Sequence, residues 1–224
     1  MRQGIAKLIE PKQTLPKDRQ IFSNKDLKTL IVPLFMEQLL AVLVGVADTF
    51  MVSYAGEAAV SGVSLVNMFN TIFLYLFSAL AAGGAIVVSQ YIGSKDQDNG
   101  NRSSGQLFMT SAVFSLFITG FVLALDRQLL KLLFGGVEPD VMEACVTYLR
   151  ISAYSYPALA VYNAGAAMYR SMGKTRVTMY LSLASNGINV AGNAIGVFLL
   201  HAGVAGVAYP SLIARIFSAA VITW

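Results

Sequence analysis

The sequence predicts an all-α polytopic membrane protein built as a six-transmembrane-helix bundle. Of its 224 residues, 56% are hydrophobic and only 12% are charged, and the mean hydropathy is +0.62. Soluble domains average about 45–50% apolar and about 25% charged residues. The apolar residues also gather into six long runs, and a helix needs about 20 such residues to cross the hydrocarbon core of a bilayer.

Short connectors rich in glycine, asparagine and charge separate the predicted spans. The spans cover residues 29–52, 60–88, 106–125, 147–168, 177–200 and 204–224. Pro33 is expected in the first turn of its span, where a missing N–H is harmless. Glu138 and Pro139 predict the start of a short interfacial helix in the connector that precedes the fourth span.

The distribution of Lys and Arg predicts the orientation. Residues 1–28 are expected to form a cytoplasmic tail, since they lack the pattern of a signal peptide. Twelve basic residues fall on the side of this tail, whereas the opposite connectors hold Arg127 and Lys131. The positive-inside rule therefore predicts a multi-pass protein of the plasma or inner membrane with a cytoplasmic N-terminus. The apolar end at Trp224 favours a fragment or half of a longer protein.

Composition argues against several other classes. The single cysteine, Cys145, rules out an internal disulfide, and one histidine beside it makes a transition-metal site a poor fit. No nucleophile–base pair or phosphate-binding loop is recognisable, so neither an enzyme nor a cofactor is expected. The topology explains the net charge of +4 better than an anionic partner does, so no nucleic acid is expected. The apolar spans predict membrane lipid as a partner.

Two carboxylates interrupt the first apolar run. A charged side chain at the centre of a span costs roughly 2.5–3.5 kcal/mol, so such residues usually face a cavity, a partner or an ion path. Glu37 and Asp48 are eleven residues apart, about three helical turns, and therefore share one face. Asp48 is the strongest candidate for a functional residue. Glu37 is expected in the inner half of the membrane. It either lines the same cavity as Asp48 or bonds only a neighbouring backbone.

Polar side chains recur at helical spacing in other spans, namely Asn67, Asn70, Asn186, Asn189, Asn193 and Ser211. The three asparagines of span 177–200 are three and four residues apart and so form one stripe. With Asp48, these groups are expected in the outer half of the bilayer. One carboxylate among amide and hydroxyl oxygens suits a hard monovalent cation or a carboxyl that takes up a proton. Alternatively, the asparagines only link helices, at about 0.6 kcal/mol each.

The fourth and sixth spans carry further candidates. Tyr156 and Asn163 flank Pro157, and they either face a cavity or pack. Pro210 predicts a kink next to Ser211. Arg215, near the middle of the membrane, requires a carboxylate, a carbonyl or water as its partner.

Taken in order, several short stretches resemble the multidrug and toxic compound extrusion (MATE) family. They are PLFMEQLL (33–40), GVADTFMVS (45–53), SQYIGSKD (89–96), YRSMGKTR (169–176), NVAGN (189–193) and GVAGVA (203–208). The resemblance implies an antiporter that exports small amphipathic, often cationic compounds, driven by inward flow of Na⁺ or H⁺. It also implies twelve spans in two lobes, with this chain as the N-terminal lobe. Its partner would be a second six-helix lobe, either a C-terminal half or another copy.

The resemblance also implies a cation site made of an Asp on the first span, an Asn and an Asp four residues apart on the fifth, and a Thr on the sixth. Asp48 and Asn189 match this pattern, while Asn193 replaces the second acid and Ser211 the threonine. Because one acid is missing, the coupling ion stays open between Na⁺ and H⁺, and the only metal expected is Na⁺ at Asp48. The substrate cavity is expected to involve Glu37, Asn67, Asn70, Tyr156, Asn163 and Asn186.

Three alternatives stay open. A lipid-linked oligosaccharide flippase of the same superfamily needs a basic cavity for diphosphate, and here only Arg215 lies deep. An intramembrane phosphotransferase needs clustered acidic metal ligands, whereas Asp96 and Asp98 stand on a polar connector without further acids. A non-transporting membrane fragment is the third.

Overall fold

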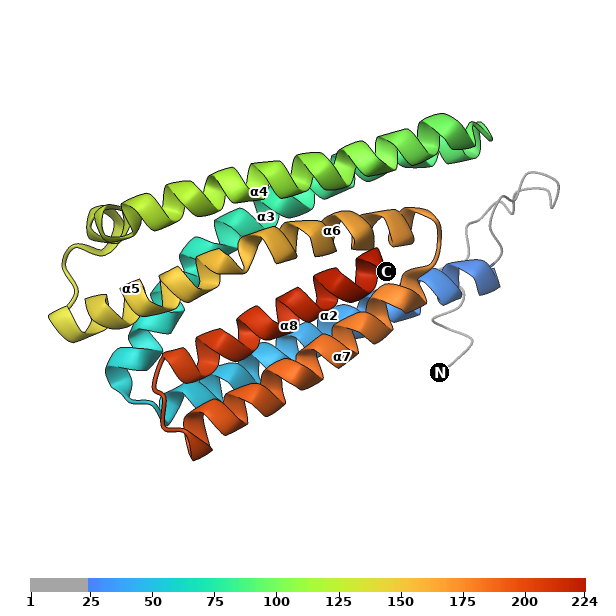
Figure 1. Cartoon of the computed structure of the whole chain (residues 1–224). Coiled ribbons are helices and arrows are strands. Elements are labelled where there is room, and N and C mark those ends of the chain that lie inside the picture. The colour runs from blue at the N-terminus through green and yellow to red at the C-terminus, as the bar shows by residue number, and fades with distance from the viewer. Residues whose placement is uncertain (1–23) are drawn as a thin grey trace, which may run out of the picture.

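The computed structural model describes residues 24–224, and all regular structure in this range is helical, as the predicted fold class requires. The elements are α2 (Asn24–Ser53), α3 (Glu57–Gly93), α4 (Gln97–Phe134), α5 (Pro139–Tyr154), α6 (Tyr156–Ser171), α7 (Thr175–Ala194), the π-helix η2 (Ile195–Leu199) and α8 (Ala205–Thr223). Figure 1 shows one elongated bundle in which the start of α2 and the end of α8 lie at the same end. Residues 1–23 of the predicted tail lie outside the described residues.

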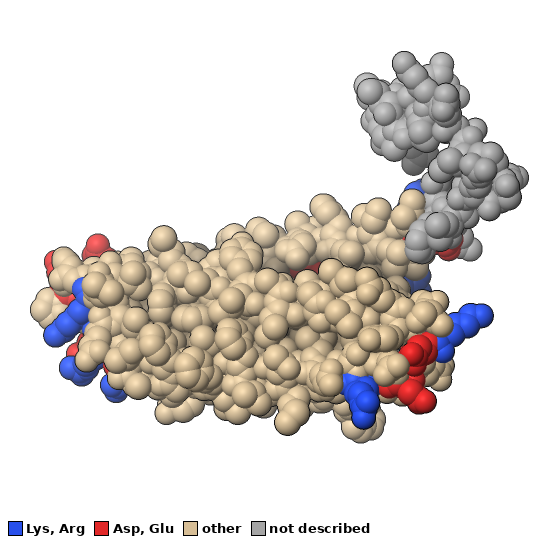
Figure 2. Space-filling view, turned by 90° about the horizontal axis from the view of Figure 1, so that it is seen from above, with Lys and Arg blue, Asp and Glu red and all other residues tan. Residues whose placement is uncertain are grey.

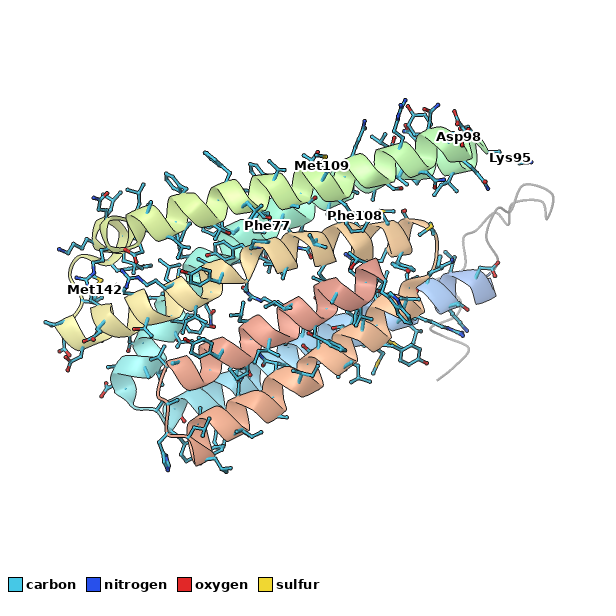
Figure 3. All side chains as sticks on the ribbon, in the orientation of Figure 1. Phe77, Lys95, Asp98, Phe108, Met109 and Met142 are labelled. Carbon is cyan, nitrogen blue, oxygen red and sulfur yellow. The ribbon has the colours of Figure 1, made fainter. Side chains whose placement is uncertain are left out.

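The outer surface of the bundle is apolar over most of its length. In the described range, α2, α3, α4 and α8 are long and apolar enough to cross a membrane. Large side chains such as Phe117 and Leu132 stand 70% and 82% exposed. On the face shown in Figure 2, charged side chains lie mostly near the two ends. Figure 3 places Lys95 and Asp98 at one end and Met142 near the other. This distribution is typical of a protein whose middle is surrounded by lipid.

Helix α2 begins earlier than the sequence predicts, so the expected place of Pro33 in a first turn is wrong. Pro33 lies inside the helix, nine residues after Asn24. Since proline has no N–H, the carbonyl of Thr29 cannot receive the usual bond from the residue four positions later. Thr175 Oγ1, at the start of α7, donates to this carbonyl over 3.5 Å. The proline thus leaves an acceptor through which α7 contacts α2.

The predicted fourth span is two helices. Helix α5 ends at Tyr154, Ser155 adopts φ −86° and ψ −10°, and α6 starts at Tyr156. Pro157 fits the first turn of α6, where no N–H is needed. The predicted helix start at Glu138 and Pro139 is confirmed, since Glu138 is the N-cap of α5. The helix is not short, however, because it runs for 16 residues to this break.

Helix α4 also extends beyond the predicted span of 106–125. It is kinked at Leu125 (φ −117°, ψ 15°) and then continues to Phe134. Directly after the kink, the buried carboxylate of Asp126 pairs with Nε of Arg150 on α5. The pair fastens the end of α4 to α5.

The main core lies where α3, α4, α5 and α6 meet. Tyr156 is 1% exposed, as is Phe77 of α3. The ring of Phe73 lies 5.1 Å from that of Tyr156, centroid to centroid. These large buried rings join α3 to the start of α6.

The π-helix η2, which continues α7, approaches the start of α8 backbone to backbone. A Cβ added to Gly196 would lie 2.1 Å from the carbonyl oxygen of Gly206, a distance that no side chain tolerates. One turn earlier, a Cβ on Gly192 would lie 2.6 Å from Cβ of Pro210. Glycine is therefore required here for close approach. The contact sets the register in which the polar faces of α7 and α8 meet.

Candidate functional site

Asp48 is bonded to the asparagine stripe of α7. Nδ2 of Asn193 donates to Asp48 Oδ1 over 2.7 Å. The carboxylate is only partly buried, whereas Asn193 is completely buried. The four residues predicted to form a cation site, Asp48, Asn189, Asn193 and Ser211, do lie together in the structure, contributed by α2, α7 and α8.

The amide of Asn189 can serve the site in two orientations. In one, its nitrogen donates to Ser211 Oγ at 2.8 Å, and its oxygen accepts from Nδ2 of Asn193 at 3.1 Å. In the other, its nitrogen donates to Asp48 Oδ1 at 3.0 Å and its oxygen accepts from Ser211 Oγ. An ionised Asp48 favours the second orientation, because the first turns an amide oxygen toward a carboxylate. A cation or a proton on Asp48 favours the first.

Asn193 also carries an unused acceptor. Its Oδ1 is buried and has no donor among the described residues. Buried polar atoms are nearly always bonded, and each exception calls for an explanation. The site therefore holds two carboxylate oxygens and two amide oxygens on three side chains. Such oxygen ligands are the type that hard cations prefer.

A small polar cavity of about 90 Å³ adjoins Asp48. Thr49, Ser64, Asn67 and Tyr148 line it together with the carboxylate. The hydroxyl of Tyr148 donates to Oδ1 of Asn67 over 3.1 Å. At about 30 Å³ for each water molecule, the cavity has room for about three waters, which suits a partly hydrated ion and excludes an amphipathic drug.

Asn67 is the one member of the predicted substrate cavity that lies beside Asp48. Asn70, one turn along α3, is buried and accepts a 2.7 Å hydrogen bond from the hydroxyl of Tyr156. This pair lies in the core rather than in the cavity beside Asp48, because Tyr156 packs among phenylalanine rings. Asn163 is also buried, and its Nδ2 has no acceptor among the described residues.

Glu37 lies apart from Asp48. Its Oε2 accepts from Thr178 Oγ1 over 3.2 Å, and its Oε1 is 3.5 Å from Nη1 of Arg170. Glu37 therefore neither lines the cavity of Asp48 nor bonds only a neighbouring backbone, the two alternatives that the sequence left open. Its partners are side chains of α6 and α7. The pair with Arg170 was missed because that arginine falls in a predicted connector, where positive charge is already explained by topology.

Asn186 lines a second cavity together with Arg215, the deep arginine whose partner the sequence leaves open. Nη1 of Arg215 donates to Ser155 Oγ over 2.6 Å. Ser155 occupies the break between α5 and α6, so the arginine of α8 is held at the one interruption of that span. No pattern in the sequence marks this serine.

Comparisons with known proteins agree with this architecture. The MatE family model matches residues 33–195. The chain is 28% identical over 220 residues to the "Uncharacterized transporter YisQ" of Bacillus subtilis, covering 96% of this chain and 47% of that protein. It is 26% identical to the "Probable multidrug resistance protein NorM" of Thermotoga maritima, covering 100% of this chain and 48% of that one. The chain thus spans about half the length of these relatives.

The fold matches that of solved structures. An outward-facing "multidrug resistance MATE family transporter of the MOP superfamily" superimposes with a TM-score of 0.83 at 21% identity. The superposition covers 89% of this chain and 44% of that one. At this identity the likeness establishes the helix arrangement alone.

Proposed function

Because the chain belongs to the MatE family, we propose that it forms the N-terminal lobe of an antiporter that exports small amphipathic, often cationic compounds in exchange for Na⁺ or H⁺. The name of the Thermotoga relative, a probable multidrug resistance protein, supports export of drug-like compounds. The length of the relatives supports a second lobe, either from the same polypeptide or from another copy. The cell membrane, with the N-terminus in the cytoplasm, is the proposed location.

The contact of Asp48 with Asn193 is the observation that carries this proposal. It places the one acidic side chain of the site against two buried amides and beside a water-sized cavity. A carboxylate in an apolar span is costly unless it binds something useful. A cation entering the cavity would meet Asp48 first, and the amide of Asn189 would then turn its oxygen toward the ion.

The helices that the site joins suggest how cation binding is coupled to export of the substrate. Asp48 is on α2, and its partners are on α7, with Ser211 of α8 bonded behind them. A cation on Asp48 replaces the amide donors, so it changes the contact between α2 and α7–α8. A cationic substrate and the driving ion favour the same negative charge and therefore compete. Alternating access in the complete transporter would use this competition.

The exposed surface of α2 supports a second lobe. Phe35 and Val46, more than two turns apart, are 64% and 65% exposed. In the described structure, 6% of the most apolar stretch of α2 is buried, against 28% for α3. We infer that lipid and the second lobe share this uncovered face, and that the substrate path runs between the lobes.

The test is efflux by the complete transporter in proteoliposomes, with ethidium as the substrate and with Na⁺ and pH gradients imposed separately. Asp48→Asn keeps the size of the side chain and removes its charge, so gradient-driven efflux should fall by about tenfold or more. Asp98→Asn is the control, because Asp98 is exposed at the start of α4. Gradient-driven efflux that survives Asp48→Asn would show that Asp48 does not couple the two flows.

A further inference from the structure

A third cavity lies between the end of α4 and the start of α5, at the end of the bundle where Figure 3 places Met142. Its volume is about 440 Å³, within the range of about 300–1,000 Å³ that small-molecule sites occupy. Arg127 and Lys131 of α4 and Arg150 of α5 line it, and Glu143 is the acid among its lining residues. The rest of the wall is uncharged, namely Pro139, Met142, Val146 and Thr147. The proposed transport function gives this cavity no role.

Two of the three basic side chains have no acidic partner. Arg150 is paired through its Nε with the buried carboxylate of Asp126. Within residues 24–224, no carboxylate pairs with Arg127 or Lys131, although Glu143 is in the same wall. The unpaired groups are thus two positive charges against one negative charge. The cavity keeps a net positive charge together with the free donors of a guanidinium and an ammonium group.

The same two bases are the exceptions to the charge distribution that orients the chain. Twelve basic residues fall on the side of the N-terminus, and the predicted connectors of the opposite side hold Arg127 and Lys131. These two are four residues apart, so they share one face of α4, and both reach the same cavity. The positive-inside rule gives no reason for a pair of bases at this end of the bundle. An anion bound there does.

The end of α4 is suited to the surface of a membrane. Helix α4 is kinked at Leu125, and Figure 1 shows its last turns nearly end-on, so they run across the long axis of the bundle. In a bundle that spans a membrane, this segment therefore lies along the membrane plane. Leu132 and Leu133 of the segment are 82% and 51% exposed. Exposed leucines beside basic side chains are typical of helices that bind anionic lipids at the interface.

We propose that the cavity between α4 and α5 binds the headgroup of an anionic phospholipid, in the leaflet on the side away from the N-terminus. Arg127 and Lys131 would hold the phosphate, as basic pockets between membrane helices do. The apolar side chains Met142 and Val146 would contact the glycerol, and the exposed leucines would lie among the acyl chains. A phosphodiester with one negative charge matches the net charge of the cavity. This inference goes beyond the proposed export function and does not depend on it.

The experiment measures lipid binding by the purified complete transporter in detergent. Phosphatidylglycerol is titrated into the protein, and the lipid concentration that gives half of the rise in Tm gives the apparent affinity. Each basic contact with an anionic lipid is worth about fivefold in affinity. Arg127→Gln combined with Lys131→Gln should therefore weaken binding by about tenfold or more. Unchanged affinity in this double variant would overturn the proposal.

A matched double variant controls for the loss of charge. Arg102→Gln combined with Arg176→Gln removes two exposed bases near the starts of α4 and α7, and it should leave the affinity for phosphatidylglycerol unchanged. An equal loss in both double variants would show a general effect of charge and refute the site. Glu143→Gln removes the opposing acid and should strengthen binding by about fivefold. Because a damaged fold does not produce such a gain, this variant decides the question if the first double variant fails to fold.

Two further ligands identify what the cavity recognises. Phosphatidylcholine carries the same chains, but its choline neutralises the phosphate, so it should bind the parent protein more weakly than phosphatidylglycerol. Equal binding of the two lipids would mean that the basic side chains do not select the headgroup, against the proposal. Glycerol phosphate has the phosphate without acyl chains and should not raise Tm at the same concentrations. Equal stabilisation by glycerol phosphate would assign the cavity to a soluble phosphate and exclude a lipid site.

Discussion

Nδ2 of Asn193 donates a 2.7 Å hydrogen bond to Oδ1 of Asp48, joining α7 to α2 across 145 positions of sequence. Asp48 is the only acid of this cluster, so in the proposed ion site its charge alone decides whether the amides donate to it or turn their oxygens to a cation. The contact ties the charge of one carboxyl group to the packing of the lobe. The contact also predicts how a second carboxylate at position 193 should change the affinity for a cation.

Asn193→Asp places a second carboxylate next to Asp48. Two ionised carboxylates at hydrogen-bonding distance repel each other strongly unless a cation lies between them. The apparent affinity of the complete transporter for its driving cation should therefore rise by about tenfold or more. It is measured as the Na⁺ or H⁺ concentration that gives half-maximal efflux.

Asn193→Leu is the companion variant, because it removes the amide without adding charge. It should weaken the cation response. If both variants kept the cation dependence of the parent protein, Asn193 would not belong to the ion site.

Gly196→Ala tests the backbone contact between η2 and α8, which sets the register of α7 and α8. The new Cβ would lie 2.1 Å from the carbonyl oxygen of Gly206, so the helices must separate. Overpacking of this kind costs about 1–3 kcal/mol. Thermal unfolding in detergent should show a lower Tm, together with a weaker cation effect on Tm.

Gly187→Ala is the matched control on α7, the helix that η2 continues. Nothing lies within 4 Å of a Cβ at Gly187, and alanine is the better helix former by about 1 kcal/mol. Its Tm should stay the same or rise. A Gly196→Ala protein as stable as Gly187→Ala would mean that the close approach at Gly206 does not constrain the lobe.

The sequence predicts the Asp48 cluster better than it predicts its surroundings. Spacing of three and four residues places Asn189 and Asn193 on one face of a helix, and counting from the span ends places them near the depth of Asp48. Periodicity does not say which helix a face meets. The sequence therefore left open whether Tyr156 lines a cavity or packs against other side chains, and the structure places it in the core. Glu37 bonds Arg170 and Thr178 and does not neighbour Asp48.

The ends of the helices were difficult to predict from the sequence for a different reason. Apolar content shows where lipid surrounds the chain, but helices continue past the lipid as long as their backbone bonds are satisfied. Helix α4 thus reaches Phe134, and the break at Ser155 falls inside an apolar run. The role of the cluster in cation binding stays a prediction that the efflux experiments test.

Asp96 provides a pH test outside the spans. It caps α4, and hydrogen bonds from the side chain and then the backbone N–H of Asn99 hold the pKa of its carboxyl below the ordinary value. A lowered pKa in the folded state means that the cap stabilises above the unfolded pKa, about 3.9, and loses this effect as pH falls through the folded value.

The Tm difference between the parent protein and Asp96→Ala should consequently be constant from about pH 5 to 8 and shrink below about pH 4. Asp98→Ala is the control, because Asp98 lies in the first turn of α4 but does not cap the helix. Its Tm difference from the parent protein should show no such pH dependence. A Tm difference for Asp96→Ala that grows on acidification would have the wrong sign for this cap.

Tyr156→Phe tests whether the core pair with Asn70 is a structural bond. The tyrosine hydroxyl is the donor to Asn70 Oδ1, and Nδ2 of the same asparagine already lacks an acceptor among the described residues. Removing the hydroxyl leaves the buried amide without either bond, at a cost of about 1–3 kcal/mol. Tyr148→Phe removes a similar bond to Asn67, but Asn67 is exposed beside the Asp48 cavity, where water can replace the donor. Unfolding in detergent should therefore give a larger loss of stability for Tyr156→Phe, and equal losses would mean that water reaches Asn70 as well.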